Sequence, residues 1–166
     1  MSFPFAIFRA ADAPTLDDTG MMSPPEFVDA AGSQALASGS FREKSTAATH
    51  VTVPFCQQGE GGTSLVLGDF APGFTVWRHS HSLDCLYFIV SGQANLGSQQ
   101  LGPGDGFFVP ANHPYGYTAG PEGVCVLEIR NGTNFDMQVL ETNMQRYVEK
   151  AEALLDAKGR VEALEH

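Results

Sequence analysis

The sequence predicts an all-β domain: an antiparallel β-barrel with an irregular N-terminal arm and a C-terminal α-helix. Three observations lead to this prediction. Short runs rich in β-branched and aromatic residues recur between Thr49 and Arg130, glycine turns separate them, and one helical pattern follows near the C-terminus. Strands of this kind, spaced by roughly 8–12 residues, are typical of barrels and sandwiches.

Residues 1–48 form the predicted arm, which is rich in turn-forming residues and shows little sustained alternation. The segment Ser23–Glu26, Ser-Pro-Pro-Glu, has the pattern of a capping box and predicts a short helix toward Leu36. We expect the arm to be ordered by packing on the barrel, which is predicted to span residues 49–132.

Residues 133–163 form the predicted C-terminal helical segment. Apolar residues recur at helical spacing over Leu140–Leu155, the stretch Thr142–Gln145 has the pattern of a second capping box, and Gly159 is expected to end the helix. Residues 164–166, Leu-Glu-His, look like the start of a vector-encoded tag and are set aside.

Composition excludes several classes of partner. The 166 residues carry a formal net charge of −10, and the nine basic residues are scattered, so nucleic acid and anionic membrane surfaces are poor partners. The longest apolar run, Cys85–Val90, is far shorter than the roughly 20 residues of a membrane span. Three cysteines without a CxxC spacing argue against a disulfide framework, and we expect a cytoplasmic protein.

Two histidines one residue apart, His79 and His81, form the candidate site. Strand alternation predicts that Thr75 and Trp77 share one face with them. If that face lines the barrel, the two imidazoles converge on a cavity, and imidazole suits Fe, Mn, Ni, Cu and Zn. The alternative is a pair of histidines hydrogen-bonded in a polar pocket without a metal.

The residues around this pair resemble the first motif of the cupin family, in which a glycine leads to His-x-His, a glutamate and a second glycine. The matching positions are Gly73, His79, His81, Cys85 and Gly92. A later stretch resembles the second cupin motif, in which a Gly-Asp turn leads to a strand, Pro-x-Gly and a ligand histidine. Its matching positions are Gly104, Asp105, Pro110, Asn112 and Tyr115.

The resemblance covers about residues 60–130 and identifies a small single-domain cupin with a jelly-roll barrel. Asn112 stands where the second motif has glycine, and asparagine keeps access to positive φ. The resemblance therefore supports the fold class that the strand pattern predicts.

The same resemblance implies an incomplete set of metal ligands. His79 and His81 keep their positions, but Cys85 stands at the glutamate position and Tyr115 at the final histidine position. His113, two residues before Tyr115, is the expected third metal contact. Taken alone, Cys85 is more simply a small buried hydrophobe. The implied substrate pocket is lined by Trp77, Cys85, Tyr87, Phe108 and Tyr115.

Two functions follow from the resemblance. In the first, the histidines hold a divalent metal such as Fe, Mn, Ni or Zn, and the protein is an enzyme with dioxygenase-like or isomerase chemistry on a small organic substrate. In the second, the protein holds no metal and the pocket binds a small molecule without catalysis.

We also expect a homodimer. Both faces of the run Cys85–Val90 are apolar, so one face can line the barrel while the other needs a cover. The helix, the arm and a second subunit are the three candidate covers. The resemblance favours the subunit, since many small cupins pair.

Overall fold

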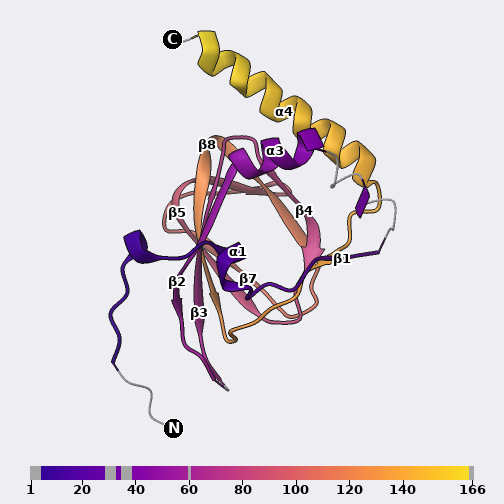
Figure 1. Cartoon of the computed structure of the whole chain (residues 1–166). Coiled ribbons are helices and arrows are strands. Elements are labelled where there is room, and N and C mark those ends of the chain that lie inside the picture. The colour runs from indigo at the N-terminus through magenta and orange to yellow at the C-terminus, as the bar shows by residue number, and fades with distance from the viewer. Residues whose placement is uncertain (1–4, 29–32, 35–38, 60, 165–166) are drawn as a thin grey trace.

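The computed structural model describes residues 5–28, 33–34, 39–59 and 61–164, and it confirms the all-β prediction (Figure 1). Within these residues, nine strands form one sheet that curves into a barrel. They are β1 (Glu26–Phe27), β2 (Thr49–Cys56), β3 (Ser64–Phe70), β4 (Thr75–Ser80), β5 (Cys85–Leu96), β6 (Gln99–Leu101), β7 (Gly106–Val109), β8 (Tyr115–Arg130) and β9 (Gln138–Val139). The strand pairs are antiparallel except for β1 with β9.

Strand β8 holds the barrel together because it pairs with three other strands. Its first residues lie beside β4 and the end of β5, and Val124–Arg130 lies between β3 and β5. The register of β5 shifts around Gly92, where a Cβ atom would lie 2.2 Å from the carbonyl oxygen of Gly123. Only glycine fits this close approach of two backbones.

The inner face of the barrel is a packed core of aliphatic and aromatic side chains. Ile89, Val126 and Tyr87 are almost fully buried there. A second cluster lies outside the barrel and joins it to the helices, with Phe41, Val139, Met144 and Val148 at its centre. Long-range β-pairing and burial of apolar surface therefore stabilise the same elements.

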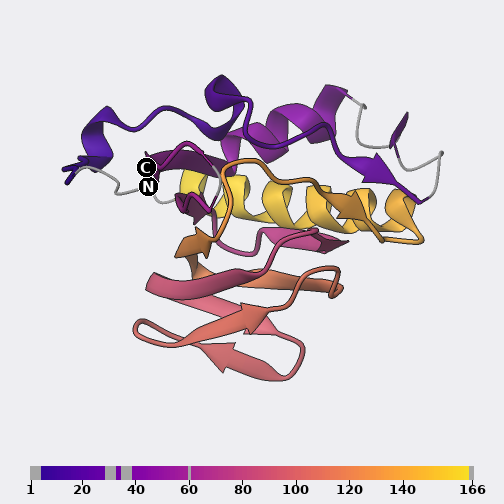
Figure 2. The ribbon, with the colours of Figure 1, turned by 90° about the horizontal axis from the view of Figure 1, so that it is seen from below.

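Two longer helices pack on one side of the barrel, α3 (Gly39–Ala47) and α4 (Met144–Leu164), while η1 (Ala10–Asp12) and α1 (Leu16–Thr19) are single turns. Figure 2 shows α3, α4 and the N-terminal segment on one side, with β5, β6 and β7 on the other. In the part of the chain that is described, no helix is long and apolar enough to cross a membrane.

The C-terminal helix is confirmed, but both of its predicted ends are wrong. The Oδ1 atom of Asn143 accepts the backbone N–H of Arg146 at 3.1 Å, so Asn143, and not Thr142, caps the helix. Asparagine is a strong N-cap because its side chain satisfies an otherwise unpaired N–H. The helix then continues through Gly159 to Leu164.

The helix predicted to begin at Ser23–Glu26 is also wrong where the structure describes it. Glu26 and Phe27 form β1, and the backbone N–H groups of Ser23 and Glu26 donate to the carbonyls of Phe135 and Met137. These N–H groups are satisfied by the neighbouring chain, so the segment is extended. The rest of that predicted helix falls mostly in 29–32 and 35–38, outside the described residues.

Strands β1 and β9 carry the sheet beyond the predicted barrel range of 49–132. They pair with each other, and β9 also pairs with β4, the strand that carries the candidate histidines. The arm and the C-terminal segment thus contribute strands beside the site.

Candidate functional site

The barrel encloses a cavity of about 570 Å³. Aromatic rings make up much of its wall, and they are Phe70, Phe74, Trp77, Tyr87, Tyr115, Tyr117 and Phe135. Polar and charged groups also face it, namely His79, His81, Glu128 and Arg130. A largely apolar pocket with a few converging polar groups is typical of small-molecule sites.

His79 and His81 both line this cavity, and their ring centroids are 4.9 Å apart. They reach it after a β-bulge in β4, since Val76 pairs with Tyr117 while His79 pairs with Tyr115. One extra residue on β4 reverses the alternation.

The prediction that Thr75 and Trp77 share a face with the histidines is therefore wrong. Val76 packs against the barrel core instead. Trp77 borders the cavity, but its ring packs in the helix cluster, 5.9 Å from the ring of Tyr147.

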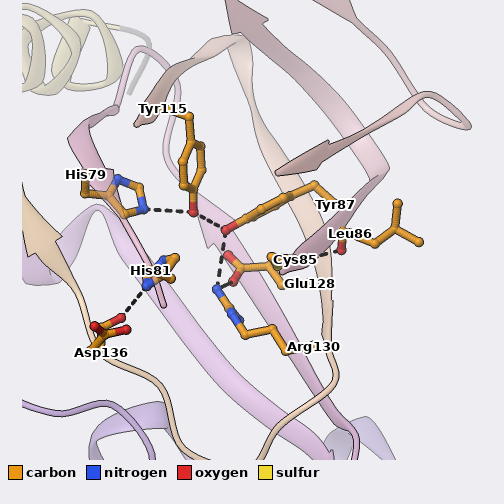
Figure 3. A network of polar contacts seen from close by, with 9 residues as sticks. All are labelled: His79, His81, Cys85, Leu86, Tyr87, Tyr115, Glu128, Arg130 and Asp136. Carbon is orange, nitrogen blue, oxygen red and sulfur yellow. Dashed lines mark hydrogen bonds and ion pairs between the residues drawn. The ribbon is translucent and has the colours of Figure 1, made fainter. Parts of the chain in front are cut away.

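A chain of hydrogen bonds connects the two sides of the cavity (Figure 3). The Trp77 carbonyl can only accept, so Nδ1 of His79 donates to it at 2.8 Å. Nε2 of the neutral ring is then an acceptor, and the Tyr115 hydroxyl donates to it at 2.8 Å. The Tyr87 hydroxyl in turn donates to Tyr115 and accepts from Nη2 of Arg130 at 3.3 Å.

His81 has a different arrangement of partners. Its Nδ1 donates to the Asp136 carbonyl, which leaves Nε2 as a lone-pair acceptor. Within the described residues we see no hydrogen bond to this Nε2 atom. The cavity therefore presents one imidazole that is fully engaged and one with a free acceptor.

Burial keeps both imidazoles neutral. It lowers the pKa of His79 from 6.5 to about 4, and the neighbouring His81 adds to this effect. It also lowers the pKa of His81 from 6.5 to about 4, with a further contribution from the charge of Arg130. Burial raises the pKa of Tyr115 far above its usual value, so its phenol keeps its proton.

Arg130 and Glu128 form a buried ion pair at the end of the hydrogen-bond chain, next to Tyr87. Nη2 of Arg130 lies 2.5 Å from Oε2 of Glu128, and the two side chains are 1% and 12% exposed. The guanidinium carbon also lies 4.2 Å from the centre of the Phe135 ring, a cation–π geometry. Nε and Nη1 of Arg130 are buried without a hydrogen-bond partner among the described residues.

The structure does not bring His113 to the histidine pair. His113 is exposed and does not line the cavity. Asn112 has a φ of 62°, which confirms the expected positive φ, and the N–H of His113 donates to the Pro110 carbonyl. This tight turn separates His113 from the strand that begins at Tyr115.

Two residues of the implied pocket also lie away from the cavity. Cys85 is buried but does not line the cavity, and burial raises the pKa of its thiol to about 12. Phe108 is exposed on the outer side of β7. Trp77, Tyr87 and Tyr115 do line the cavity.

These residues do not fit a resident divalent metal ion in this arrangement. Across the described part of the chain, no three His, Cys, Asp or Glu side chains converge as metal ligands. The lone pair of His79 that faces the cavity already accepts the Tyr115 hydroxyl. The positive charge of Arg130, which disfavours protonation of His81, also opposes a dication beside it.

Sequence reasoning missed Glu128, Arg130 and Asp136. Glu128 and Arg130 alternate with apolar residues in the run Val124–Arg130 and share the inward face of Val124 and Val126. Charged residues on the buried face of a strand are a signal that could have identified them. Asp136 contributes a backbone carbonyl to His81, for which the sequence has no signal.

No family model and no curated protein matches this chain. Solved structures match about half of this chain. The chain is similar to KdgF from Halomonas sp., with 20% identity over 52% of this chain and 81% of that chain and a TM-score of 0.45. It is similar to an RmlC-like cupin from Shewanella frigidimarina, with 21% identity over 50% and 75% of the two chains and a TM-score of 0.43.

A third similar structure is the DMSP lyase DddQ from Ruegeria pomeroyi, with 26% identity over 47% of this chain and a TM-score of 0.40. The match spans only 45% of the length of that lyase. One of these similar structures is itself named a cupin, the family that the two sequence motifs resemble.

Proposed function

We propose that the barrel cavity binds a small organic molecule directly, without a metal ion. The observation that carries this proposal is the 2.8 Å hydrogen bond between the Tyr115 hydroxyl and Nε2 of His79. It places a phenol where a metal would need a free lone pair, and the raised pKa of Tyr115 keeps that phenol protonated. The proposal assigns binding and no reaction.

The cavity wall indicates what kind of molecule fits. The aromatic residues favour an apolar or aromatic body, and a volume of about 570 Å³ suits a small ligand. The free Nε2 of His81 needs a donor, so the ligand carries a hydroxyl or N–H group at that point. The other ionisable groups beside it are neutral, apart from the Arg130–Glu128 ion pair.

Metal loading tests the proposal. Wild type and Tyr115→His are incubated with Fe(II), Mn(II), Ni(II) or Zn(II), passed through a desalting column and subjected to elemental analysis. We expect no stoichiometric metal in wild type. Tyr115→His puts a third imidazole beside His79 and His81, and we expect it to retain metal.

Tyr115→Phe is the matched control, because it frees Nε2 of His79 without adding a ligand, and it is expected to stay metal-free. Thermal shifts with phenol and toluene test binding on the same proteins, since only phenol can donate to His81. Phenol should stabilise wild type more than toluene does. Stoichiometric metal in wild type that is lost in His79→Ala would contradict the proposal and favour the metal-dependent dioxygenase-like or isomerase function.

A further inference from the structure

Arg130 is buried inside the barrel, but only one of its nitrogen atoms has hydrogen-bond partners. Nη2 donates to Oε2 of Glu128 at 2.5 Å and to the Tyr87 hydroxyl at 3.3 Å (Figure 3). Nε and Nη1 have no partner among the described residues, although the side chain is only 1% exposed. Every N–H of a guanidinium is a donor, so Arg130 keeps unpaired donors in the interior.

Such unpaired atoms are few in this chain. In the described part, four buried side-chain N or O atoms lack a hydrogen-bond partner, and two of them belong to Arg130. The others are Oγ of Ser64, which does not line the cavity, and Nε1 of Trp77, whose ring packs in the helix cluster. Arg130 itself lines the cavity. An unpaired buried donor costs free energy, and an acceptor atom placed in the cavity removes that cost.

The free acceptor of the cavity, Nε2 of His81, lies near the same arginine. The guanidinium carbon of Arg130 is 4.2 Å from the centre of the Phe135 ring, and the centre of the His81 ring is 5.5 Å from it. Because both distances end at the same ring, a single small aromatic molecule is long enough to reach both groups. That molecule needs an acceptor for Arg130 and a donor for His81.

The charges of the cavity indicate that the acceptor is neutral. Glu128 already balances the charge of Arg130 through the 2.5 Å ion pair. The two histidines are neutral, and the buried phenols of Tyr87 and Tyr115 keep their protons. A ligand carboxylate would add an uncompensated negative charge close to Glu128, which is unfavourable in a buried site. A carbonyl oxygen accepts the same hydrogen bonds without adding charge.

We propose that the cavity selects uncharged molecules that carry both a hydroxyl and a carbonyl group, such as hydroxylated aromatic ketones. The hydroxyl donates to Nε2 of His81, and the carbonyl oxygen accepts from Nε or Nη1 of Arg130. This inference rests on the proposed function, because it assigns a ligand class to the same metal-free cavity. Glu128 becomes a specificity-determining residue, since its charge disfavours a carboxylate at the position of the carbonyl.

Isothermal titration calorimetry on the full chain at about pH 6.5 tests the ligand class, because carboxylates are ionised and phenols are neutral at that pH. The probes meta- and para-hydroxyacetophenone carry both groups at two different separations. Para-ethylphenol lacks the carbonyl, acetophenone lacks the hydroxyl, and para-hydroxybenzoate has a carboxylate in place of the ketone. We expect at least one hydroxyacetophenone to bind about tenfold more tightly than each of these three probes.

Glu128→Gln tests the role of charge, because it removes the carboxylate and keeps Arg130, so that the cavity becomes positively charged. We expect para-hydroxybenzoate to bind this variant about tenfold or more tightly than it binds wild type, and para-hydroxyacetophenone to change less. Glu122→Gln is the matched control. Glu122 is exposed and does not line the barrel cavity, so removing the same charge there should leave every affinity unchanged.

The double variant Arg130→Met, Glu128→Gln removes the unpaired donors together with both charges. We expect it to lose the preference for a carbonyl, so that para-hydroxyacetophenone binds no more tightly than para-ethylphenol. Circular dichroism checks that each variant folds, and the comparison of probes on wild type is decisive without any variant.

The outcomes separate this inference from the proposed function. If phenol stabilises wild type but the carbonyl adds no affinity, the cavity binds small molecules and the ligand class is wrong. A carboxylate probe that binds wild type as tightly as the ketones, or that gains nothing in folded Glu128→Gln, would overturn the preference for an uncharged ligand. Wild type that binds none of the probes, phenol included, would overturn both proposals.

Discussion

The two faces of strand β5 have nearly the same hydrophobicity in sequence but different surroundings in the structure. On the inner face, Cys85, Tyr87 and Ile89 are 1%, 2% and 0% exposed. On the outer face, Leu86, Phe88 and Val90 remain about half exposed. The inner face has its partners within the chain, in the core and in the hydrogen-bond chain through Tyr87.

This difference shows that an apolar run without alternation carries two kinds of information. One face of such a strand packs in the domain's own core, and the other indicates an interface with something else. The free energy of unfolding should therefore depend on the inner face, and assembly on the outer face.

The largest effect on the free energy of unfolding is expected from breaking the ion pair between Arg130 and Glu128, which lies inside the barrel. Arg130→Met leaves Glu128 as a buried carboxylate without its cation, which should lower the free energy of unfolding by about 3–5 kcal/mol. Urea unfolding measures it. The double variant Arg130→Met, Glu128→Gln removes both charges and should be more stable than Arg130→Met alone; equal or lower stability would show that the charge imbalance is not the cause.

The next largest effect is expected when a residue on the inner face of β5 is replaced, and its neighbour on the outer face provides the comparison. Ile89→Ala opens a cavity in the core and should cost about 2–5 kcal/mol in urea unfolding. Phe88→Ala, measured at protein concentrations low enough to keep the chain monomeric, should cost less than about 1 kcal/mol. Similar losses for the two variants would mean that the outer face is also part of the monomer's core.

The pH dependence of the free energy of unfolding should also arise from residues inside the barrel. His79 and His81 have folded pKa values of about 4 against 6.5 when unfolded, so between these values the unfolded chain binds more protons. The stabilisation that depends on the neutral histidines is complete above pH 6.5 and decreases as the pH falls toward 4. Each histidine contributes a slope of up to roughly 1.4 kcal/mol per pH unit.

Urea unfolding at several pH values between 4 and 6.5 measures this slope. Replacing both residues, His79→Gln with His81→Gln, should flatten it. The exposed His113 supplies the control, because His113→Gln removes a histidine that lies outside the cavity. A slope that survives the double variant would place the proton uptake elsewhere.

Much of the fold could be predicted because its signals are local. Strand runs, glycine turns and helical spacing identified the barrel and the C-terminal helix. The two motifs have Gly92 inside β5 and Asn112 in a turn, and both residues have positive φ. Such positions depend on the backbone conformation of a single residue.

The helix ends could not be predicted as reliably, because several residues compete for each cap. Thr142 and Asn143 are both good N-caps, and packing of Met144 and Val148 on Phe41 decides where the helix begins. The helix passes Gly159 because one glycine costs only about 1 kcal/mol in a helix.

By itself, the sequence determined the all-β class, the neighbouring histidines and the apolar character of both faces of β5, since each depends on residue type and short spacing. Only the tertiary structure decided what surrounds them. A single bulge in β4 reverses the face of Trp77, a turn at Asn112 takes His113 away, and pairing across β8 brings Arg130 to Tyr87. These placements depend on register between strands distant in sequence, where one residue of shift exchanges the inside of the barrel for the outside.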